Sequence, residues 1–168
     1  MLQNKGSNGL KILVVELVRD LRDIEAIASS LVKAWEKASR QGLNDLEVNG
    51  AAHLLENFYT AIEELFLRIA KDIDLDVPTG EQWHREILQR MNLDLPEIRP
   101  AVISQDLTET LDGYRRFRHR ARHVYAPPVP DWQKFSHLAD EAENTYRALK
   151  ESIENWLLFL SAVSQKLP

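Results

Sequence analysis

Residues 10–41 read LKILVVELVRDLRDIEAIASSLVKAWEKASRQ, and the spacing of their apolar side chains decides the fold class. Apolar or small residues recur three or four positions apart, at Leu10, Val14, Leu17, Leu21, Ile24, Ala28, Leu31 and Trp35. On a helix this spacing gathers them along one side and leaves the other side polar. The stretch therefore predicts a long amphipathic helix that packs in a bundle, and Gly42 is a suitable residue to end it.

Two further helices are predicted in the central part of the chain. The first has two candidate N-caps, Asn44 and Asn49, and ends before Pro78. The second is short, covers residues 80–91 and follows a capping-box pattern that begins at Thr79.

The last two predicted helices are again long. One covers residues 102–125, with Ser104 as its candidate N-cap, and the prolines after Ala126 end it. The other covers residues 131–165, with Asp131 as its N-cap. No segment alternates with a period of two residues for long enough to form a strand. We therefore expect an all-α fold, an up-and-down helical bundle of four long helices plus one short helix.

The composition is that of one globular domain. The chain has 168 residues, of which 44% are hydrophobic and 28% are charged, which is enough apolar material for a core. It has no cysteine, which excludes disulfides and thiolate metal sites, and no apolar run approaches the ~18 residues of a membrane span. We expect residues 1–9 to be a flexible N-terminus, residues 10–168 to form a single helical domain, and the protein to be soluble and cytoplasmic.

The charge of the chain is unevenly distributed. Its net charge of -5 argues against a general nucleic-acid binder. Residues 113–130, however, contain five arginines and two histidines and no acidic residue. Without those five arginines, 16 of the 21 basic residues would remain against 26 acidic ones. Positive charge concentrated in this way creates a local field that attracts anions.

The basic segment reads YRRFRHRARHVY over residues 114–125 and lies on the predicted fourth helix. At about 100° per residue, its apolar residues share the side toward the core: Tyr114, Phe117, Ala121 and Val124. A basic set lies on the other side: Arg115, His119, Arg122 and His123. Arg118 and Tyr125 lie on the border between the two sides, where a cleft between packed helices would open.

Arg118 and His123 are the candidate catalytic residues. An arginine presents a planar, permanently charged fork that suits a phosphate, and an imidazole can move a proton near neutral pH. The pair suits RNA cleavage without a metal. His123 would help to take the proton from a ribose 2′-hydroxyl, and Arg118 would stabilise the charge that develops on the phosphate. Their basic neighbours are candidate substrate-binding residues: Arg115, His119 and Arg122.

The spacing of these residues resembles a known motif. Arg118, four intervening residues, His123, one residue and Tyr125 match the RX4HXY pattern of the HEPN ribonucleases. The segment RFRHRARHVY ends a helix and is followed by a final long helix, which resembles the arrangement of the HepT-like toxins. The polar His119 fits the position after the motif arginine, and the stretch WHREIL at residues 83–88 is also similar to that group.

The resemblance implies an activity and partners. HEPN toxins are metal-independent endoribonucleases that act as homodimers, with the motif helices of two protomers meeting at a shared cleft. HepT toxins are paired with a nucleotidyltransferase antitoxin that adenylylates the motif tyrosine. Carried over to this chain, Arg118 and His123 are the catalytic pair for an RNA substrate, Tyr125 is the modified residue, and no cofactor is needed. The long first helix and the additional arginines depart from the most compact HepT pattern.

Other interpretations of single residues stay open. His119 and His123 have the i, i+4 spacing of a metal pair, but no third ligand is evident and the nearby arginines repel cations. His84 and Arg85 could extend the cleft or form a pair on the surface, and Tyr125 could be a core aromatic residue.

The competing functional class is a binding module. A non-catalytic HEPN-like scaffold or nucleotide-binding module would dock a nucleotidyltransferase partner through the same basic surface. An enzyme predicts that Arg118 and His123 converge on an open, positively charged cleft. A scaffold predicts that they pair with local carboxylates or are covered by packing.

Overall fold

The computed structural model describes residues 7–123 and 129–164 of the chain. Its α-helices are α1 (Ser7–Gln41), α2 (Asp45–Ile69), α3 (Trp83–Met91), α4 (Gln105–His123), α5 (Ser136–Asp140) and α6 (Ala142–Ser164). A π-helical turn, η2 (Ala70–Asp74), extends α2, and a short 3-10 turn, η3 (Trp132–Lys134), precedes α5. Within the described ranges no strand occurs beyond one isolated bridge, so the all-α prediction is confirmed.

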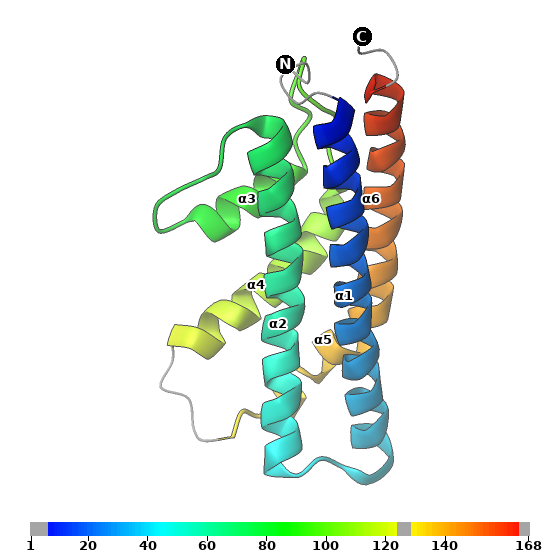
Figure 1. Cartoon of the computed structure of the whole chain (residues 1–168). Coiled ribbons are helices and arrows are strands. Elements are labelled where there is room, and N and C mark those ends of the chain that lie inside the picture. The colour runs from blue at the N-terminus through cyan, green and yellow to red at the C-terminus, as the bar shows by residue number, and fades with distance from the viewer. Residues whose placement is uncertain (1–6, 124–128, 165–168) are drawn as a thin grey trace.

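The long helices form a bundle around a single core (Figure 1). α1 and α2 make an antiparallel hairpin, and α6 packs along α1. α4 crosses the others obliquely and packs on α2, while α3 contacts both α2 and α4. The core side chains come from all the long helices and include Leu17, Phe58, Ile62, Leu111 and Leu149. The junction of α2, α3 and α4 is therefore the place where the basic segment of α4 meets the rest of the protein.

The starts of α1 and α2 are set by local sequence. α1 begins at Ser7, three residues before the start predicted at Leu10. α2 begins after a complete capping box, in which Asn44 Oδ1 accepts from Glu47 N and Glu47 Oε2 accepts from Asn44 N, each at 3.0 Å. The prediction of Asn44 as N-cap is confirmed. The alternative start at Asn49 is wrong, because Asn49 lies inside the helix.

α3 begins at Trp83, later than predicted. Gly80 has a φ of +94°, in the left-handed region, so the chain turns there before the helix starts. Gln82 is the N-cap and makes no side-chain capping bond. The capping box predicted from Thr79 is therefore wrong, since the turn at Gly80 separates Thr79 from the helix. The prediction of Ser104 as the N-cap of α4 is confirmed, because Ser104 Oγ accepts a hydrogen bond from the amide of Leu107 at 3.2 Å.

The helix predicted over residues 131–165 is interrupted twice. Asp131 caps only the short turn η3, and Phe135 then leaves helical geometry with φ -135° and ψ 0°. The buried ring of Phe135 packs on Phe117 and Trp132, with ring centroids 5.1 and 5.2 Å away. Burial of this aromatic cluster outweighs the continuous hydrogen bonding of a straight helix.

The second interruption separates α5 from α6 at Glu141. The hydroxyl of Tyr114, on α4, donates to the carbonyl of Leu138 at 2.8 Å and lies 3.3 Å from the hydroxyl of Thr145. The carbonyl of Leu138 thus accepts a hydrogen bond from another helix. In an uninterrupted helix it would accept one from a backbone amide of the same helix. Sequence periodicity does not reveal this bond, because its two residues lie far apart in the chain.

A buried ion pair holds the loop between α3 and α4. Nε and Nη2 of Arg99 donate to the two carboxylate oxygens of Asp74 at 2.6 and 2.8 Å, and the two side chains are 0% and 3% exposed. Arg99 also donates to the backbone carbonyls of Arg90, Leu93 and Pro100. Asp74 closes the turn η2 at the end of α2, so the pair fastens the loop to α2 and fixes where α4 begins.

We predict that Asp74→Asn destabilises the protein strongly. The substitution removes the carboxylate and leaves the Arg99 guanidinium buried without an opposite charge, which typically costs about 3–5 kcal/mol. Asp76→Asn is the matched control. Asp76 lies only two residues from Asp74 and also pairs with an arginine, Arg90, but its side chain is 72% exposed. An exposed pair of this kind contributes about 1 kcal/mol or less. Urea unfolding measures both changes, and equal losses for the two variants would contradict the assignment of Asp74 as the loop anchor.

Candidate functional site

The apolar side of the basic segment packs on α2 and on the start of α5, since Tyr114 lies against Phe58 and Phe117 lies against Phe135. Tyr114 and Phe117 are buried, as predicted. Ala121 is exposed, contrary to the prediction, because the last turn of α4 extends past the neighbouring helices (Figure 1). The predicted core residue Val124 lies outside the described residues.

The structure describes only some of the predicted site residues. The side chains of Arg115, Arg118 and His119 are described, whereas those of Arg122 and His123 and the whole of Tyr125 lie outside the described residues. The convergence of Arg118 with His123 and the accessibility of Tyr125 therefore stay predictions.

Arg118 is buried, not at an exposed border, since only 7% of its surface is exposed. Its Nε donates to Oγ1 of Thr60 at 2.9 Å, and its Nη1 lies 3.5 Å from Oε2 of Glu63. The angular position of Arg118 on the helix predicted the border between the two sides, and a guanidinium is costly to bury without an opposite charge. The carboxylate of Glu63 supplies that charge. Two contacts from α2 thus fix both the position and the orientation of the guanidinium.

Glu63 is the site residue that the sequence analysis missed. It is 2% exposed, and its two carboxylate oxygens have different partners. Oε1 lies 2.7 Å from Nδ1 of His84, and Oε2 faces Arg118. A signal for this residue exists in the sequence, because Glu63 follows Tyr59 by four positions and precedes Phe66 by three. Helix geometry therefore places Glu63 on the buried side of α2, where a carboxylate needs a partner.

His84, the second residue of α3, is held from two sides. Its Nδ1 faces Glu63, and its ring stacks on the indole of Trp83 with centroids 3.6 Å apart and planes tilted by 33°. Nη1 of Arg118 lies 3.4 Å from the same nitrogen. The side chain is nevertheless 30% exposed. His84 therefore extends the site of Arg118 and does not form a surface pair with Arg85.

Five basic side chains line one small pocket between α3 and α4: His84, Arg85, Arg115, Arg118 and His119. The pocket has a volume of about 180 Å³, and Glu81 and Gln82 complete its wall. Part of the positive charge is offset, because Arg115 Nε donates to Asp112 at 2.7 Å. The pocket brings together three residues that the sequence predicted as neighbours, Arg115, Arg118 and His119, with two from α3. Its chemistry suits a small anion such as a phosphate.

The phenol of Tyr59, on α2, lies in the field of the same charges. Burial raises the pKa of Tyr59 far above its ordinary value, and the negative charge of Glu63 raises this pKa further, whereas Arg115 and Arg118 lower it. The phenol stays protonated at neutral pH and cannot act as a base.

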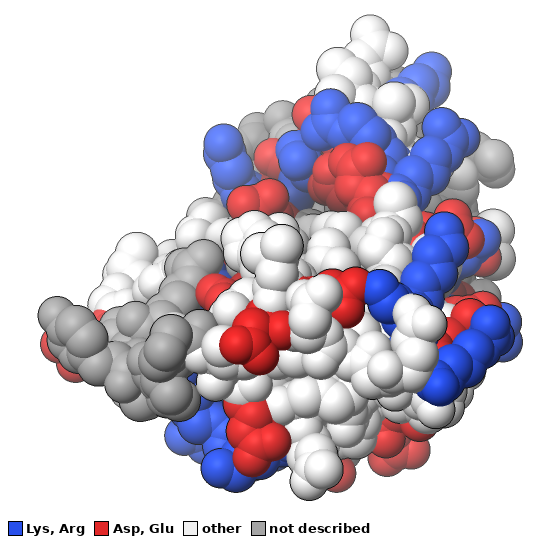
Figure 2. Space-filling model, turned by 90° about the horizontal axis from the view of Figure 1, so that it is seen from below, with Lys and Arg blue, Asp and Glu red and all other residues white. Residues whose placement is uncertain are grey.

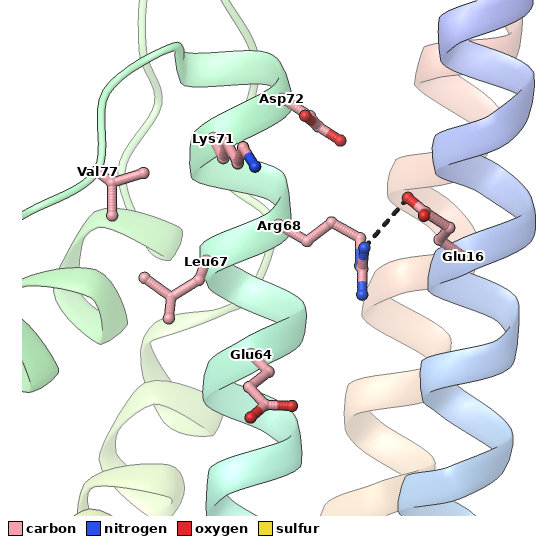
Figure 3. A pocket seen from close by; sticks show the side chains of 7 residues that line it. All are labelled: Glu16, Glu64, Leu67, Arg68, Lys71, Asp72 and Val77. Atoms are coloured by element: carbon pink, nitrogen blue, oxygen red, sulfur yellow. Dashed lines mark ion pairs between the residues drawn. The ribbon is translucent and has the colours of Figure 1, made fainter.

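Other parts of the surface carry charges of both signs. Seen from the end where α1 joins α2, lysine and arginine lie among acidic side chains, and a broad area carries neither (Figure 2). A larger hollow of about 490 Å³ is lined by residues of α1, α2 and η2 (Figure 3). There Arg68 reaches toward α1 and pairs with Glu16 at 3.1 Å and Asp20 at 2.9 Å. The lining of this hollow holds three acidic side chains and two basic ones, so the hollow has no excess positive charge. The ion pairs of Arg68 link α2 to α1 there.

Among the described residues, no group of three His, Cys, Asp or Glu side chains is placed to hold a metal ion. No described helix is both long enough and apolar enough to cross a membrane.

Comparison with known proteins adds one match. A family model described as HepT-like protein matches residues 50–160, which extend from the first turns of α2 into α6. The matched region includes Glu63, His84 and Arg118, whereas α1 lies before it. No curated protein and no solved structure matches the chain.

Proposed function

The chain belongs to the HepT-like family of the HEPN superfamily, and from that premise we propose that it is a metal-independent endoribonuclease toxin. Arg118 and His123 act as the catalytic pair on one RNA phosphodiester. The observation that carries the proposal is the placement of Arg118, whose guanidinium forms part of a pocket with four other basic side chains. Such a pocket attracts the phosphate of an RNA strand even though the chain as a whole is acidic.

In this proposal Arg118 is a preorganised cation. Thr60 and Glu63 hold Nε and Nη1, so the guanidinium needs little rearrangement when negative charge develops on the phosphate. The described contacts of the guanidinium with Thr60 and Glu63 use Nε and Nη1, so Arg118 would bind the substrate through Nη2. His123, five residues further along α4, takes the proton of the 2′-hydroxyl. Arg115, His119 and Arg122 bind neighbouring phosphates by charge.

A non-catalytic scaffold is the second candidate, and one observation favours it. Arg118 pairs with the local carboxylate of Glu63, as a purely structural arginine would. The pocket favours the enzyme, because a structural ion pair does not require Arg85, Arg115 and His119 to gather around it. Cleavage assays separate the two candidates directly.

We predict that His123→Ala and Arg118→Lys both lose most RNA cleavage. Loss of a general base typically lowers the rate ~10²–10⁴-fold, and loss of an oriented charge partner lowers it ~10²–10³-fold. Lysine is chosen at position 118 because it keeps a positive charge beside buried Glu63 and so protects the fold. Labelled RNA is incubated with each variant, with and without EDTA, which should have no effect.

Two controls accompany this assay. Arg40→Ala, at the exposed end of α1, should cut at the wild-type rate. Arg115→Ala should weaken RNA binding, with a defect that fades at high salt as the electrostatic attraction is screened. If unmodified wild-type protein cuts no RNA, the scaffold function replaces the enzyme. If the His123 and Arg118 variants cut like wild type, the catalytic site lies elsewhere.

We also propose that the protein is a homodimer whose two α4 helices face one shared cleft. The motivation is the family membership together with the size of the pocket, since about 180 Å³ holds a phosphate but cannot grip an RNA strand. Analytical sedimentation should give a mass of two 19.4 kDa chains at micromolar concentration. A single-chain mass under those conditions counts against the shared cleft.

The proposed antitoxin is a nucleotidyltransferase that adds AMP to Tyr125. The added phosphate would place negative charge beside Arg118 and Arg122 and occupy the position of the RNA phosphate, so toxicity should fall. The protein is incubated with ATP and a purified nucleotidyltransferase of the antitoxin type, and the mass shift is mapped on peptides. Tyr125→Phe should remain unmodified. Adducts at another residue in the wild-type protein would exclude this regulation.

A further inference from the structure

The pair formed by Glu63 and His84 lies outside the segment that carries the proposed catalytic residues. His84 comes from α3 and Glu63 from α2. Nδ1 of His84 lies 2.7 Å from Oε1 of Glu63. Glu63 is 2% exposed, so water does not compete for its carboxylate. Together with the stacking on Trp83, this contact leaves the imidazole little freedom to rotate. The side chain of His84 is thus held in one orientation while 30% of it stays exposed.

The contacts also determine which nitrogen carries a proton. A carboxylate only accepts hydrogen bonds, so Nδ1–H of His84 donates to Oε1 of Glu63. Arg118 Nη1, at 3.4 Å from Nδ1, is itself a donor and cannot bond to a protonated nitrogen, and the shorter contact therefore decides the tautomer. Nε2, on the opposite edge of the ring, is left to accept a proton or, in the imidazolium, to donate one.

The surroundings of His84 are those of an anion site. Its side chain lines the pocket of about 180 Å³ together with Arg85, Arg115, Arg118 and His119. At ~30 Å³ per water molecule this is the space of about six waters, enough for a phosphate group. A phosphate held there by the guanidinium groups would lie within reach of an imidazole from α3 as well as of groups from α4. The site thus offers a proton-transfer group on each of two helices.

Cleavage of RNA without a metal needs two proton transfers. As the 2′-oxygen forms its bond to phosphorus, it loses a proton to a base. As the bond from phosphorus to the 5′-oxygen breaks, that oxygen leaves with the bonding electron pair and must gain a proton. The products are a 2′,3′-cyclic phosphate and a 5′-hydroxyl, and no oxidation or reduction occurs. One imidazole that has just accepted the first proton does not supply the second in the same concerted step.

We infer that His84, oriented by Glu63, is a catalytic residue that donates the second proton to the leaving 5′-oxygen through Nε2. The inference rests on the proposed ribonuclease activity and adds a proton donor from α3 to the pair on α4. His84 starts the reaction as imidazolium and ends it neutral, His123 starts neutral and ends protonated, and exchange with water resets both. Glu63 is a positioning residue, because it touches His84 and Arg118 and not the RNA.

The experiment compares two leaving groups. One RNA has an ordinary linkage, and the other has sulfur in place of the bridging 5′-oxygen. A thiol has a pKa of ~8.5, so a thiolate leaves without being protonated. The variant is His84→Asn, whose side-chain amide can still donate to Glu63 but cannot transfer a proton at neutral pH. His137→Asn is the matched control, since His137 is exposed on α5, away from the pocket.

We expect His84→Asn to cut the ordinary RNA ~10²–10⁴-fold more slowly than wild type and the sulfur-containing RNA within about tenfold of wild type. His123→Ala should be slow on both RNAs, because the 2′-hydroxyl must be deprotonated in each case. His137→Asn should match wild type throughout. Circular dichroism and urea unfolding confirm that each variant is folded, so that a general loss of structure is recognised by equal defects on both RNAs.

The other outcomes contradict either the role of His84 or the proposed ribonuclease function. If His84→Asn cuts ordinary RNA at the wild-type rate, His84 is no proton donor, while the proposed activity stands. If the variant is equally slow on both RNAs, His84 acts on structure or binding and the inference fails. If wild-type protein cuts neither RNA, the proposed function fails and the inference fails with it.

Discussion

The buried carboxylate of Glu63 is the constraint on which the site depends. A charge that is 2% exposed must be offset locally, and the partners come from two other helices. One oxygen faces His84 of α3 and the other faces Arg118 of α4, so a single side chain of α2 sets the separation of the two helices at the pocket. The arrangement is costly to assemble, but once formed it holds an imidazole and a guanidinium beside each other without a bound ligand. In the proposed ribonuclease, this preorganisation would stabilise the charge that develops on the phosphate.

Much of the fold could be predicted from local sequence. The apolar stripe from Leu10 to Leu31 is nearly continuous, and the N-caps at Asn44 and Ser104 are made by side chains only three residues from the amides they accept from. The two breaks in the predicted last helix have a common cause, because each depends on a partner far away in the chain. Phe135 breaks its helix to pack on Phe117, and the break at Glu141 accompanies a bond from Tyr114. A hydrophobic pattern records which side of a helix is apolar, and it does not record what that side touches.

In the candidate site too, relations within one helix could be predicted and contacts between helices could not. Arg115, Arg118 and His119 were predicted as neighbours because the pitch of one helix settles their relation. The burial of Arg118 was not predicted, since it depends on an anion contributed by α2. His84 and Glu63 could be suspected only separately, one from a familiar stretch of α3 and the other from a charge among apolar positions. The contacts of Glu63 with His84 and with Arg118 form only when α2, α3 and α4 are packed together. The loop anchored by Arg99 and Asp74 contributes to that packing by fixing where α4 starts.

The π-helical turn η2 lets α2 hold one extra residue without changing the direction in which its end faces. Such a turn closes its hydrogen bond over five residues where an α-helical turn closes it over four, so the side chains that follow keep nearly the same direction about the axis. Thr60 and Glu63 lie before η2 and Asp74 lies at its end. Loss of one residue from inside η2 would restore the ordinary pitch and still leave Asp74 turned toward Arg99. The pocket and the loop anchor share one helix, and this turn allows the length of that helix to vary without disturbing either of them.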